Sequence, residues 1–391
     1  MTETSLGELS MNGGRYGIAA SAVDYTPDLP AYLRITDIRD DGTLDLSSRK
    51  SVEDPNATDY MLEPNDIVFA RTGNSTGRNY FYDPRDGRFA YAGFLIKFSL
   101  NPAEVNPRYI KYYAQSKPYW DWVASFNTGS TRGNINAKTY ASMPITLPSR
   151  CTQDGIVRFC DAISDKIRVN GQINGYLEEL LVARYDELFA ADNREYDGTI
   201  SDVGEVVGGA TPSKKKAEYY TREGIGWITP RDLSNTTDKF ISHGADDITQ
   251  AGYNSCSARL MPAGTVLFSS RAPIGYIAIA TDELATNQGF KSVVPKEDIG
   301  TAFVYCFLKR NKDRIADAGS GTTFPEVSGK TMKGIGLAVP DRSLCEKFSD
   351  WADPILRQQR LLEEENRRLR QLRDTILPKL MTGEIDLSSV K

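Results

Sequence analysis

The sequence contains little of what catalysis or metal binding usually requires. It has one histidine, His243, on which a Ser-His-Asp triad or a histidine metal site would have to depend. We interpret that residue as a solvated loop side chain. The five cysteines show no C-x-x-C spacing, which argues against both a zinc site and a disulfide framework. Phosphate-binding patterns of the forms G-x-G-x-x-G and G-x-x-x-x-G-K-[ST] are also missing, so catalysis is the weaker hypothesis.

Long apolar runs are missing as well. No stretch of about eighteen apolar residues occurs and the first residues form no basic, apolar leader. We therefore expect neither a membrane span nor a secretory signal, and we place the protein in the cytoplasm. The chain has 391 residues, 40% hydrophobic and 25% charged, which predicts a globular protein of two or three domains. Its net charge of −5 does not by itself indicate a nucleic-acid partner, so any DNA affinity must come from how the charges are placed.

An internal repeat organises the chain. Residues 129–148, GSTRGNINAKTYASMPITLP, align without a gap with residues 321–340, GTTFPEVSGKTMKGIGLAVP. YLRITDI at 32–38 matches GWITPRDL at 226–233, and LEPNDIVFAR matches the longer string LMPAGTVLFSSR so that both end on an arginine. Two long copies indicate a duplicated domain pair with a pseudo-two-fold axis, and not a solenoid.

Each copy begins with a region that we expect to fold as a mixed α/β globule. Short β-branched runs alternate with Gly, Pro, Asn and Asp, which predicts strands and turns. The polar loops 71–78 and 269–274 each lie between two such runs. The segments 107–126 and 299–318 have helical spacing and are expected to pack on the strands.

Each globule is followed by a predicted long helix. From 152 to 190 and from 343 to 377, apolar side chains recur at three- and four-residue steps, which predicts a coiled-coil-like seam. About 35 to 40 residues at 1.5 Å each make a rod of roughly 50 to 60 Å, suited to be a spacer. Asn174 and Asn366 occupy equivalent seam positions, where a buried Asn would fix the register; the alternative is that both are solvated at the seam edge. Pro354 should weaken its helix least, because we expect it near the first turns.

The polar loops suit the reading of nucleic acid better than they suit catalysis. The stretch at 267–295, LFSSRAPIGYIAIATDELATNQGFKSVVP, carries Arg, Ser, Asn and Gln side chains without a catalytic group. Such side chains bind base edges, because Arg pairs with guanine O6 and N7, and Asn or Gln with adenine N6 and N7. Two related heads on a stiff spacer fit a partner that presents two separated features, as DNA half-sites do.

Several of these strings resemble the specificity subunit of type I restriction-modification systems. The resemblance covers essentially the whole chain, and its order of recognition domain, helix, recognition domain, helix is the order that the repeat predicts. The second half carries GGATPSK, GWITPRDL, GTVLFSSRAPIGYIAIATDELATNQGF, GSGTTFPEVSGKTMKGIGLAVP and the tail ILPKLMTGEIDL. The first half resembles another branch of the same recognition domains through YLRITDI, LEPNDIVFARTGNSTGRNYFY and NINAKTYASMPITLP.

This resemblance implies a fold and a set of partners. The fold class would be α/β (mixed α+β), with two tandem target recognition domains whose long helices pair as an antiparallel coiled coil with pseudo-two-fold symmetry. Each recognition domain would read one half of a split double-stranded DNA sequence, and two methyltransferase subunits would dock on the helices and globules. S-adenosylmethionine in those subunits would methylate adenine N6, while ATP and Mg would act in a restriction subunit; this chain would bind no cofactor and no metal. The expected division is 1–150 for the first recognition domain, 151–192 for the central helical spacer, 193–341 for the second recognition domain, and 342–391 for the C-terminal helical spacer and tail.

The polar and basic loop residues are the candidates for DNA binding. Lys138 and Lys330 align and suit phosphate contacts, whereas Arg71 and Arg271 are the better candidates for base readout. In the first half the candidates are Arg71, Asn74, Thr76, Arg78, Ser130, Thr131, Arg132, Asn134 and Lys138. In the second half they are Lys214, Lys215, Lys216, Arg231, Ser270, Arg271, Asn287, Gln288, Thr322, Thr323 and Lys330.

Each choice has a plainer alternative. The three consecutive lysines could be a solvated charge run, Asn287 and Gln288 could cap their own turn, and Arg71 and Arg271 could form structural ion pairs. For the whole chain, the alternatives are a specificity subunit of a type IIB-like or orphan modification system, a scaffold that binds proteins, and an enzyme acting alone.

Overall fold

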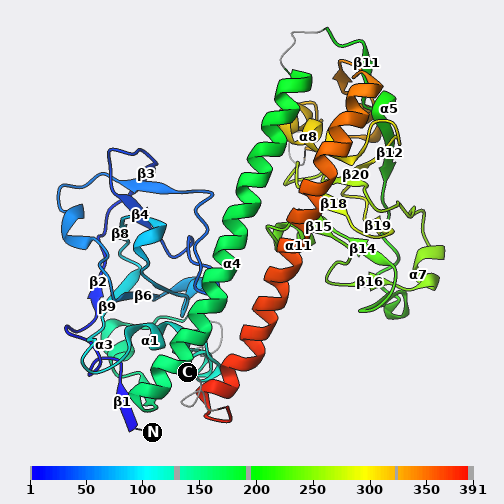
Figure 1. Ribbon diagram of the computed structural model, residues 1–391. Coiled ribbons are helices and arrows are strands. Elements are labelled where there is room, and N and C mark those ends of the chain that lie inside the picture. The colour runs from blue at the N-terminus through cyan, green and yellow to red at the C-terminus, as the bar shows by residue number, and fades with distance from the viewer. Residues whose placement is uncertain (1, 127–132, 191–194, 322–324, 386–391) are drawn as a thin grey trace. The chain divides into compact units, whose positions relative to one another are not determined.

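The protein is described here by a computed structural model that covers residues 2–126, 133–190, 195–321 and 325–385 (Figure 1). The chain divides into two compact units. The first unit joins Met1–Lys166 to Leu369–Lys391, and the second is Ile167–Arg368. Both divisions fall inside long helices, so each unit contains a part of each long helix, and the finer borders expected from the sequence stay a prediction.

The first unit is built on two four-stranded sheets, with strand orders β2-β9-β6-β7 and β3-β5-β4-β8, and on a two-stranded sheet of β1 and β10. The strand β6, with the sequence DIVFA, is buried along its whole length because it pairs on both edges. The strands are β1 Thr2–Ser5, β2 Arg15–Tyr16, β3 Ala22–Asp24, β4 Ala31–Leu33, β5 Lys50–Val52, β6 Asp66–Ala70, β7 Asn79–Phe81, β8 Phe89–Tyr91, β9 Leu95–Ser99 and β10 Pro144–Leu147.

Short helices complete the first unit. The segment 107–126 forms two helices, because Pro118 falls in the first turn of the second one and cannot continue the first. Asn106 caps the first by accepting a hydrogen bond from the Arg108 N–H. The helices are α1 Pro107–Tyr113, α2 Lys117–Ala124 and α3 Ala137–Ala141.

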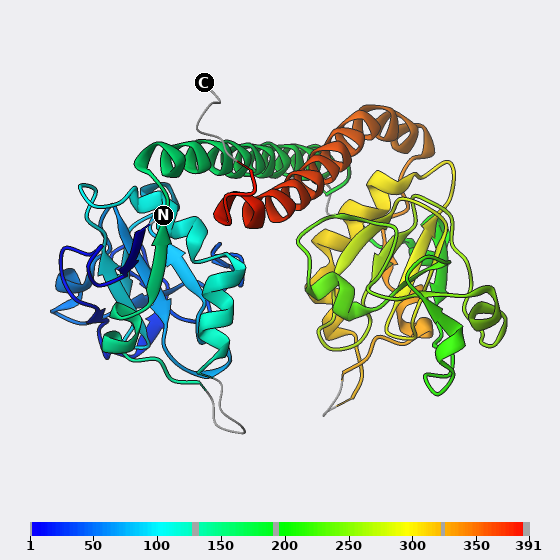
Figure 2. The same ribbon diagram turned by 90° about the horizontal axis from the view of Figure 1, so that it is seen from below.

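The second unit contains a five-stranded sheet of order β12-β20-β17-β18-β15 and three two-stranded sheets. The helix α8 packs on β17, β18 and β20, and the segment 299–318 is again two helices and not one. Seen from below, each unit mixes short strands with short helices (Figure 2). The elements are β11 Gly198–Thr199, α5 Ile200–Val203, β12 Gly204–Gly208, β13 Tyr220–Thr221, β14 Gly226–Ile228, α6 Pro230–Ser234, β15 Phe240–Ile241, β16 Asp247–Ile248, α7 Gln250–Asn254, β17 Val266–Phe268, β18 Ile277–Ala280, β19 Leu284–Thr286, β20 Lys291–Pro295, α8 Thr301–Arg310, α9 Lys312–Asp317, α10 Gly329–Lys333 and β21 Gly336–Leu337.

The two units repeat the same backbone hydrogen bonds. The Ile18 N–H donates to the Tyr91 carbonyl at 3.0 Å, and the Ala210 N–H donates to the Thr286 carbonyl at 3.0 Å. A Cβ added at the glycine just before either donor, Gly17 or Gly209, would lie within 2.3 Å of a backbone oxygen. Only glycine fits there, so the close approach is a property of the fold in both copies.

The hydrogen bonds also correct the expected pairing of the two loop arginines. The Arg71 N–H donates to the Phe94 carbonyl at 3.0 Å, and the Ser270 N–H donates to the Gly289 carbonyl at 2.7 Å. Arg71 is therefore equivalent to Ser270, and Arg271 is one residue further along. The strings that both end on an arginine do not align at that arginine.

The long helices are α4 Arg150–Tyr185, which ends in a π-helical turn at Asp186–Ala190, and α11 Arg342–Met381. Both start within two residues of the expected positions, since apolar side chains at helical spacing continue through them. Pro354 lies well inside α11 and not in its first turns, so that expectation was wrong; the helix continues through it. No helix in the described ranges is long and apolar enough to cross a membrane.

Within the second unit, α4 and α11 pair antiparallel (Figure 1). Asn170 donates to the side chain of Asn366 at 2.9 Å, while Asn174 donates to the backbone carbonyl of Gln359 at 3.3 Å. Asn366 is buried and Asn174 half-buried, so neither lies solvated at the edge of the seam. The side-chain partner of Asn366 is Asn170, which is itself fully buried.

Candidate nucleic-acid interface

The first unit brings most of its predicted DNA-binding residues to one place. The loop after β6 pairs with the strand-like segment before α3 through a bridge between Thr72 and Asn134. The Ile135 N–H donates to the Arg71 carbonyl at 2.9 Å, and the Thr76 hydroxyl donates to the Gly133 carbonyl at 2.9 Å. The surface therefore combines Arg71, Asn74, Thr76, Asn134 and Lys138, of which Asn74, Asn134 and Lys138 are exposed.

Arg71 lies between two aromatic side chains that the sequence analysis missed. Its guanidinium carbon is 5.2 Å from the ring centroid of Tyr16 and 5.9 Å from that of Phe94. Phe94 is 55% exposed at the turn between β8 and β9, and Tyr16 is also exposed. Within the described residues Arg71 forms no ion pair, and its guanidinium is held by cation–π contacts with the two rings. An aromatic residue after a glycine in a turn was the only sequence signal for Phe94.

Arg78 is held more tightly than the other loop candidates. Its Nε lies 2.6 Å from a carboxylate oxygen of Asp40, and a terminal nitrogen donates to the Ile38 carbonyl at 3.2 Å. Asp40 is mostly exposed, so the ion pair contributes little to stability but orients Arg78 toward its own domain. Five further candidates, Ser130, Thr131, Arg132, Thr322 and Thr323, lie outside the described residues.

In the second unit, the predicted DNA-binding residues that follow β17 lie beside those that follow β19. Ser270 is fully buried and its hydroxyl donates to the Gly289 carbonyl, so it supports the loop from inside. Asn287 accepts a hydrogen bond from the Gly289 N–H at 2.8 Å, which is the turn-capping geometry that we had left as its alternative. Gln288 is exposed, and its side-chain oxygen accepts a hydrogen bond from Thr211.

Arg271 belongs to a charged cluster that the sequence analysis did not identify. Its Nε is 3.0 Å from one carboxylate oxygen of Glu326, and the Nζ of Lys291 is 3.5 Å from the other. Burial alone would raise the pKa of Glu326, but the hydrogen bond and charge of Arg271, with a smaller effect of Lys291, lower that pKa below its usual value. We call these three residues the Arg271 cluster.

The remaining basic candidates of the second unit are exposed. Lys214, Lys215 and Lys216 follow one another in an exposed segment, where the Lys216 ammonium lies 2.9 Å from the Tyr219 hydroxyl. Arg231 on α6 and Lys330 on α10 also face solvent. Lys330 lies two residues after the N-cap Ser328, just as Lys138 lies two residues after the N-cap Asn136 in the first unit. That repeated arrangement supports one shared role for the two aligned lysines.

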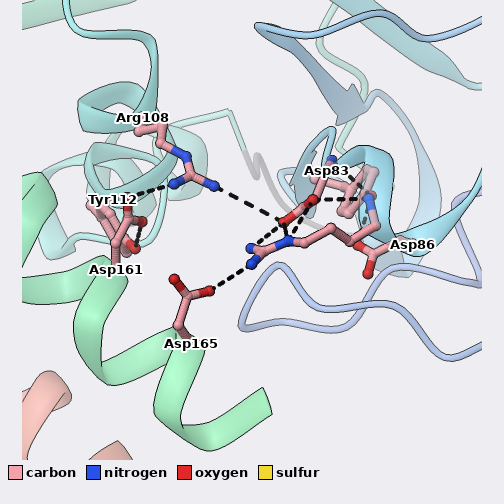
Figure 3. Close-up of polar contacts among 8 residues, drawn as sticks. Asp83, Asp86, Arg108, Tyr112, Asp161 and Asp165 are labelled. Atoms are coloured by element: carbon pink, nitrogen blue, oxygen red, sulfur yellow. Dashed lines mark hydrogen bonds and ion pairs between the residues drawn. The ribbon is translucent and has the colours of Figure 1, made fainter. Parts of the chain in front are cut away.

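Other polar clusters tie the long helices to the rest of each unit. In the first unit, Arg108 contacts Asp161 of α4 at 2.7 Å, and Arg85 contacts Asp165 of α4 at 2.9 Å (Figure 3). Burial would raise the pKa of Asp83, yet the hydrogen bonds and charge of Arg85 lower it to about 2. The side chains of these groups point toward one another (Figure 3).

In the second unit the corresponding link centres on Lys239, whose ammonium contacts the carboxylate of Glu178 on α4 and, at 2.6 Å, the side-chain oxygen of Gln359 on α11. Burial alone would raise the pKa of Glu178, but the charge and hydrogen bond of Lys239 lower that pKa to about 2. Glu363 on α11 accepts hydrogen bonds from the Lys239 and Phe240 N–H groups, and burial raises its pKa to about 7. We call this group the Lys239 cluster.

The family model for the type I restriction modification DNA specificity domain matches residues 32–179 and 195–360, which is well over half of the chain. The chain belongs to this family. The resemblance found in the sequence is confirmed. The family's role is DNA specificity, and type I specificity subunits are recognition subunits without a catalytic function of their own.

Individual relatives agree with this membership. The chain is 40% identical over 174 residues to the type I restriction enzyme MjaIX specificity subunit of Methanocaldococcus jannaschii, a match that spans 42% of this chain and 40% of that protein. It is 22% identical over 411 aligned positions to the HindI specificity subunit of Haemophilus influenzae, covering 85% of this chain and 89% of the relative. The crystal structure of the S subunit of a type I restriction-modification system from M. genitalium shares the fold with a TM-score of 0.56, at 18% identity over 97% of this chain and 95% of that one.

Three of the five thiols of this specificity subunit are buried, whereas its histidine is exposed. Burial raises the pKa of Cys160, Cys306 and Cys345 to about 12, so these thiols stay protonated and pack as apolar groups. His243 is exposed and its Nδ1 lies 2.7 Å from the buried carboxylate of Asp247. In the part of the chain that the structure describes, no three His, Cys, Asp or Glu side chains gather where they could hold a metal ion.

Proposed function

We propose that this chain selects a two-part DNA sequence, one part for each recognition domain, as the specificity subunit of a type I restriction-modification complex. The observation that carries the proposal is the pair of equivalent loops. The same backbone hydrogen bonds present Arg71 in one domain and Ser270 in the other, and Thr72 in one and Arg271 in the other. Because the shared scaffold offers Arg71 in one domain and an exposed Arg271, one position further along, in the other, the two domains would read different bases.

The proposed contacts divide by chemistry. Arg71, Asn74, Thr76 and Asn134 would face bases in the first half of the target. Arg271, Gln288 and Arg231 would do so in the second half. The exposed lysines, Lys138, Lys214, Lys215, Lys216 and Lys330, would bind phosphates, which positions the protein without reading sequence. Ser270 and Asn287 would shape the second loop from behind, since their polar atoms are already engaged within it.

The long helices would carry the partner subunits. Val169, Ile173, Tyr176 and Leu180 are exposed on α4 at three- and four-residue steps, which aligns them on one face of the helix. An exposed apolar stripe of this kind marks a protein-binding surface, and we assign it to a methyltransferase subunit. Two such subunits would transfer methyl groups from S-adenosylmethionine to adenine N6, and restriction subunits using ATP and Mg would complete the complex in the cytoplasm. A flipped adenine would be methylated by the partner and not by this chain.

The experiment that tests this proposal is genome-wide mapping of modified adenines in the host, with and without this gene. We expect a split motif of two short sequences with a fixed gap, and we expect its methylation to vanish on deletion. Complementation with the Arg71→Ala chain should relax the motif in one half only, and with the Arg271→Ala chain in the other half only. An unchanged methylation pattern after deletion would overturn the proposal.

A further inference from the structure

The Arg271 cluster differs from everything at the equivalent place in the first unit. The bridge between Arg271 and Glu326 corresponds to the bridge between Thr72 and Asn134 of the first unit. The same backbone hydrogen bond lies beside each bridge. In the second unit the Val327 N–H donates to the Ser270 carbonyl, and in the first unit the Ile135 N–H donates to the Arg71 carbonyl, both at 2.9 Å. An acidic residue at a DNA-facing surface repels phosphates. Its presence there therefore needs a reason.

The backbone fixes where the carboxylate of Glu326 can lie. Besides the bridge to Arg271, Glu326 exchanges two backbone hydrogen bonds with Ser320, at 2.9 and 3.0 Å. Two neighbouring strands of chain thus hold its Cα. Its side chain reaches Arg271 at the Nε atom, 3.0 Å away.

Because Glu326 contacts Arg271 at Nε, the two terminal nitrogens of the guanidinium can still bind a base. Guanine recognition uses two parallel N–H donors aimed at O6 and N7, and the two terminal nitrogens of a guanidinium supply that pair. Glu326 approaches Arg271 most closely at Nε, and within the described part of the chain no hydrogen bond engages the terminal nitrogens of Arg271. The carboxylate therefore orients the guanidinium without occupying its fork.

Lys291 keeps the cluster attractive to DNA. Its ammonium is 3.5 Å from the second carboxylate oxygen of Glu326 and donates to the Ser270 hydroxyl at 3.4 Å, and its side chain is only 15% exposed. Two cations and one anion leave a net positive charge at the surface. The carboxylate still penalises any docking in which Arg271 turns away toward a phosphate, because Glu326 would then lose its closest partner.

We infer that Glu326 is a positioning residue for base readout: it holds Arg271 for one guanine of the second half-site and weakens binding to DNA that lacks that base. This inference rests on the proposed function and deepens it. The effect is confined to the second half-site, since the first unit has Thr72 and Asn134 at the equivalent positions.

The test is a binding titration with the full chain in its complex with the methyltransferase subunits. Three kinds of labelled duplex are compared: the mapped target, a set with single substitutions at each base pair of both halves, and a random sequence. We expect Glu326→Gln to bind the random duplex severalfold more tightly and to lose about 10-fold in discrimination at the one base pair where Arg271→Ala also loses it. In the double variant the loss should be no larger than in Arg271→Ala alone.

Two further variants separate position from charge. Glu326→Asp keeps the charge but shortens the side chain, so it should lose discrimination without the gain in random-sequence binding. Glu205→Gln removes a carboxylate from an exposed pair with Arg259 of the same unit, at 2.6 Å, and should leave discrimination unchanged. Wild-type discrimination at every base pair by Glu326→Gln, or an equal loss in both halves, overturns the inference. Failure of the wild-type complex to prefer the mapped target over random DNA would instead overturn the proposed function.

Discussion

Replacing Lys239 by methionine tests how firmly the second recognition domain is joined to the long helices. The Lys239 ammonium contacts Glu178 and Gln359, lies 4.5 Å from the ring centroid of Tyr305, and belongs to a side chain that is only 9% exposed. Methionine keeps the apolar stem but removes the charge. Glu178 then stays half-buried with Lys309 as its remaining cation.

Removing one partner of a buried ion pair costs about 3–5 kcal/mol, because the other charge is left uncompensated. Since Lys309 remains close to Glu178, we expect the lower end of that range, about 3 kcal/mol, in the free energy of unfolding. Adding Glu178→Gln to Lys239→Met should recover part of the loss, because the uncompensated charge disappears.

The measurement is urea unfolding followed by circular dichroism, together with hydrogen exchange of α8, which reports the second unit. The matched control is Lys117→Met, which breaks an exposed ion pair with Asp121 and should cost less than about 0.5 kcal/mol. If Lys239→Met costs no more than this control, or if Glu178→Gln makes it worse, the buried charge does not act as we describe.

Three further predictions concern pH, base readout and assembly. Burial raises the pKa of Glu363 from 4.5 to about 7, so the folded state holds the proton more tightly than the unfolded state. The resulting stabilisation, about 3 kcal/mol, is complete below about pH 4.5 and is lost as pH rises through 7. Urea unfolding over this pH range should show the loss in the wild-type chain and not in Glu363→Gln. Arg71→Ala should weaken target binding by about 1–3 kcal/mol and blur one base pair of the first half, whereas an even loss over all sequences would make Arg71 a phosphate contact. Ile173→Asp with Tyr176→Asp on α4 should abolish co-purification with the methyltransferase subunit while the chain's circular dichroism is unchanged; retained co-purification would show that the partner binds elsewhere.

The duplicated plan and the long helices could be predicted from the sequence because their signals are periodic and local. Apolar residues at three- and four-residue steps place α4 and α11, and the ungapped match of 129–148 with 321–340 places α3 and α10. The helical segment expected at 107–126 is divided into two helices because Pro118 lies in the first turn of the second, which is a local signal in the sequence.

The site was harder to predict because its contacts join distant segments. Glu326 and Arg271 meet through a bridge between two loops, and Tyr16 reaches Arg71 from another strand. The composition of these segments does not predict such contacts. The equivalence of Arg71 with Ser270 depends on the length of the strand before the loop, which only the hydrogen-bond register fixes.

The shared framework of the two loops has a consequence for how such a protein can change. Each loop is joined to its neighbouring segments by bonds between peptide groups, so under the proposed function a new amino acid at an exposed position such as Asn74 or Gln288 would change the base contact and leave those backbone bonds in place. Under the proposed function, a change of the recognised sequence in one half would then carry little penalty in folding, and the other half would keep its own sequence.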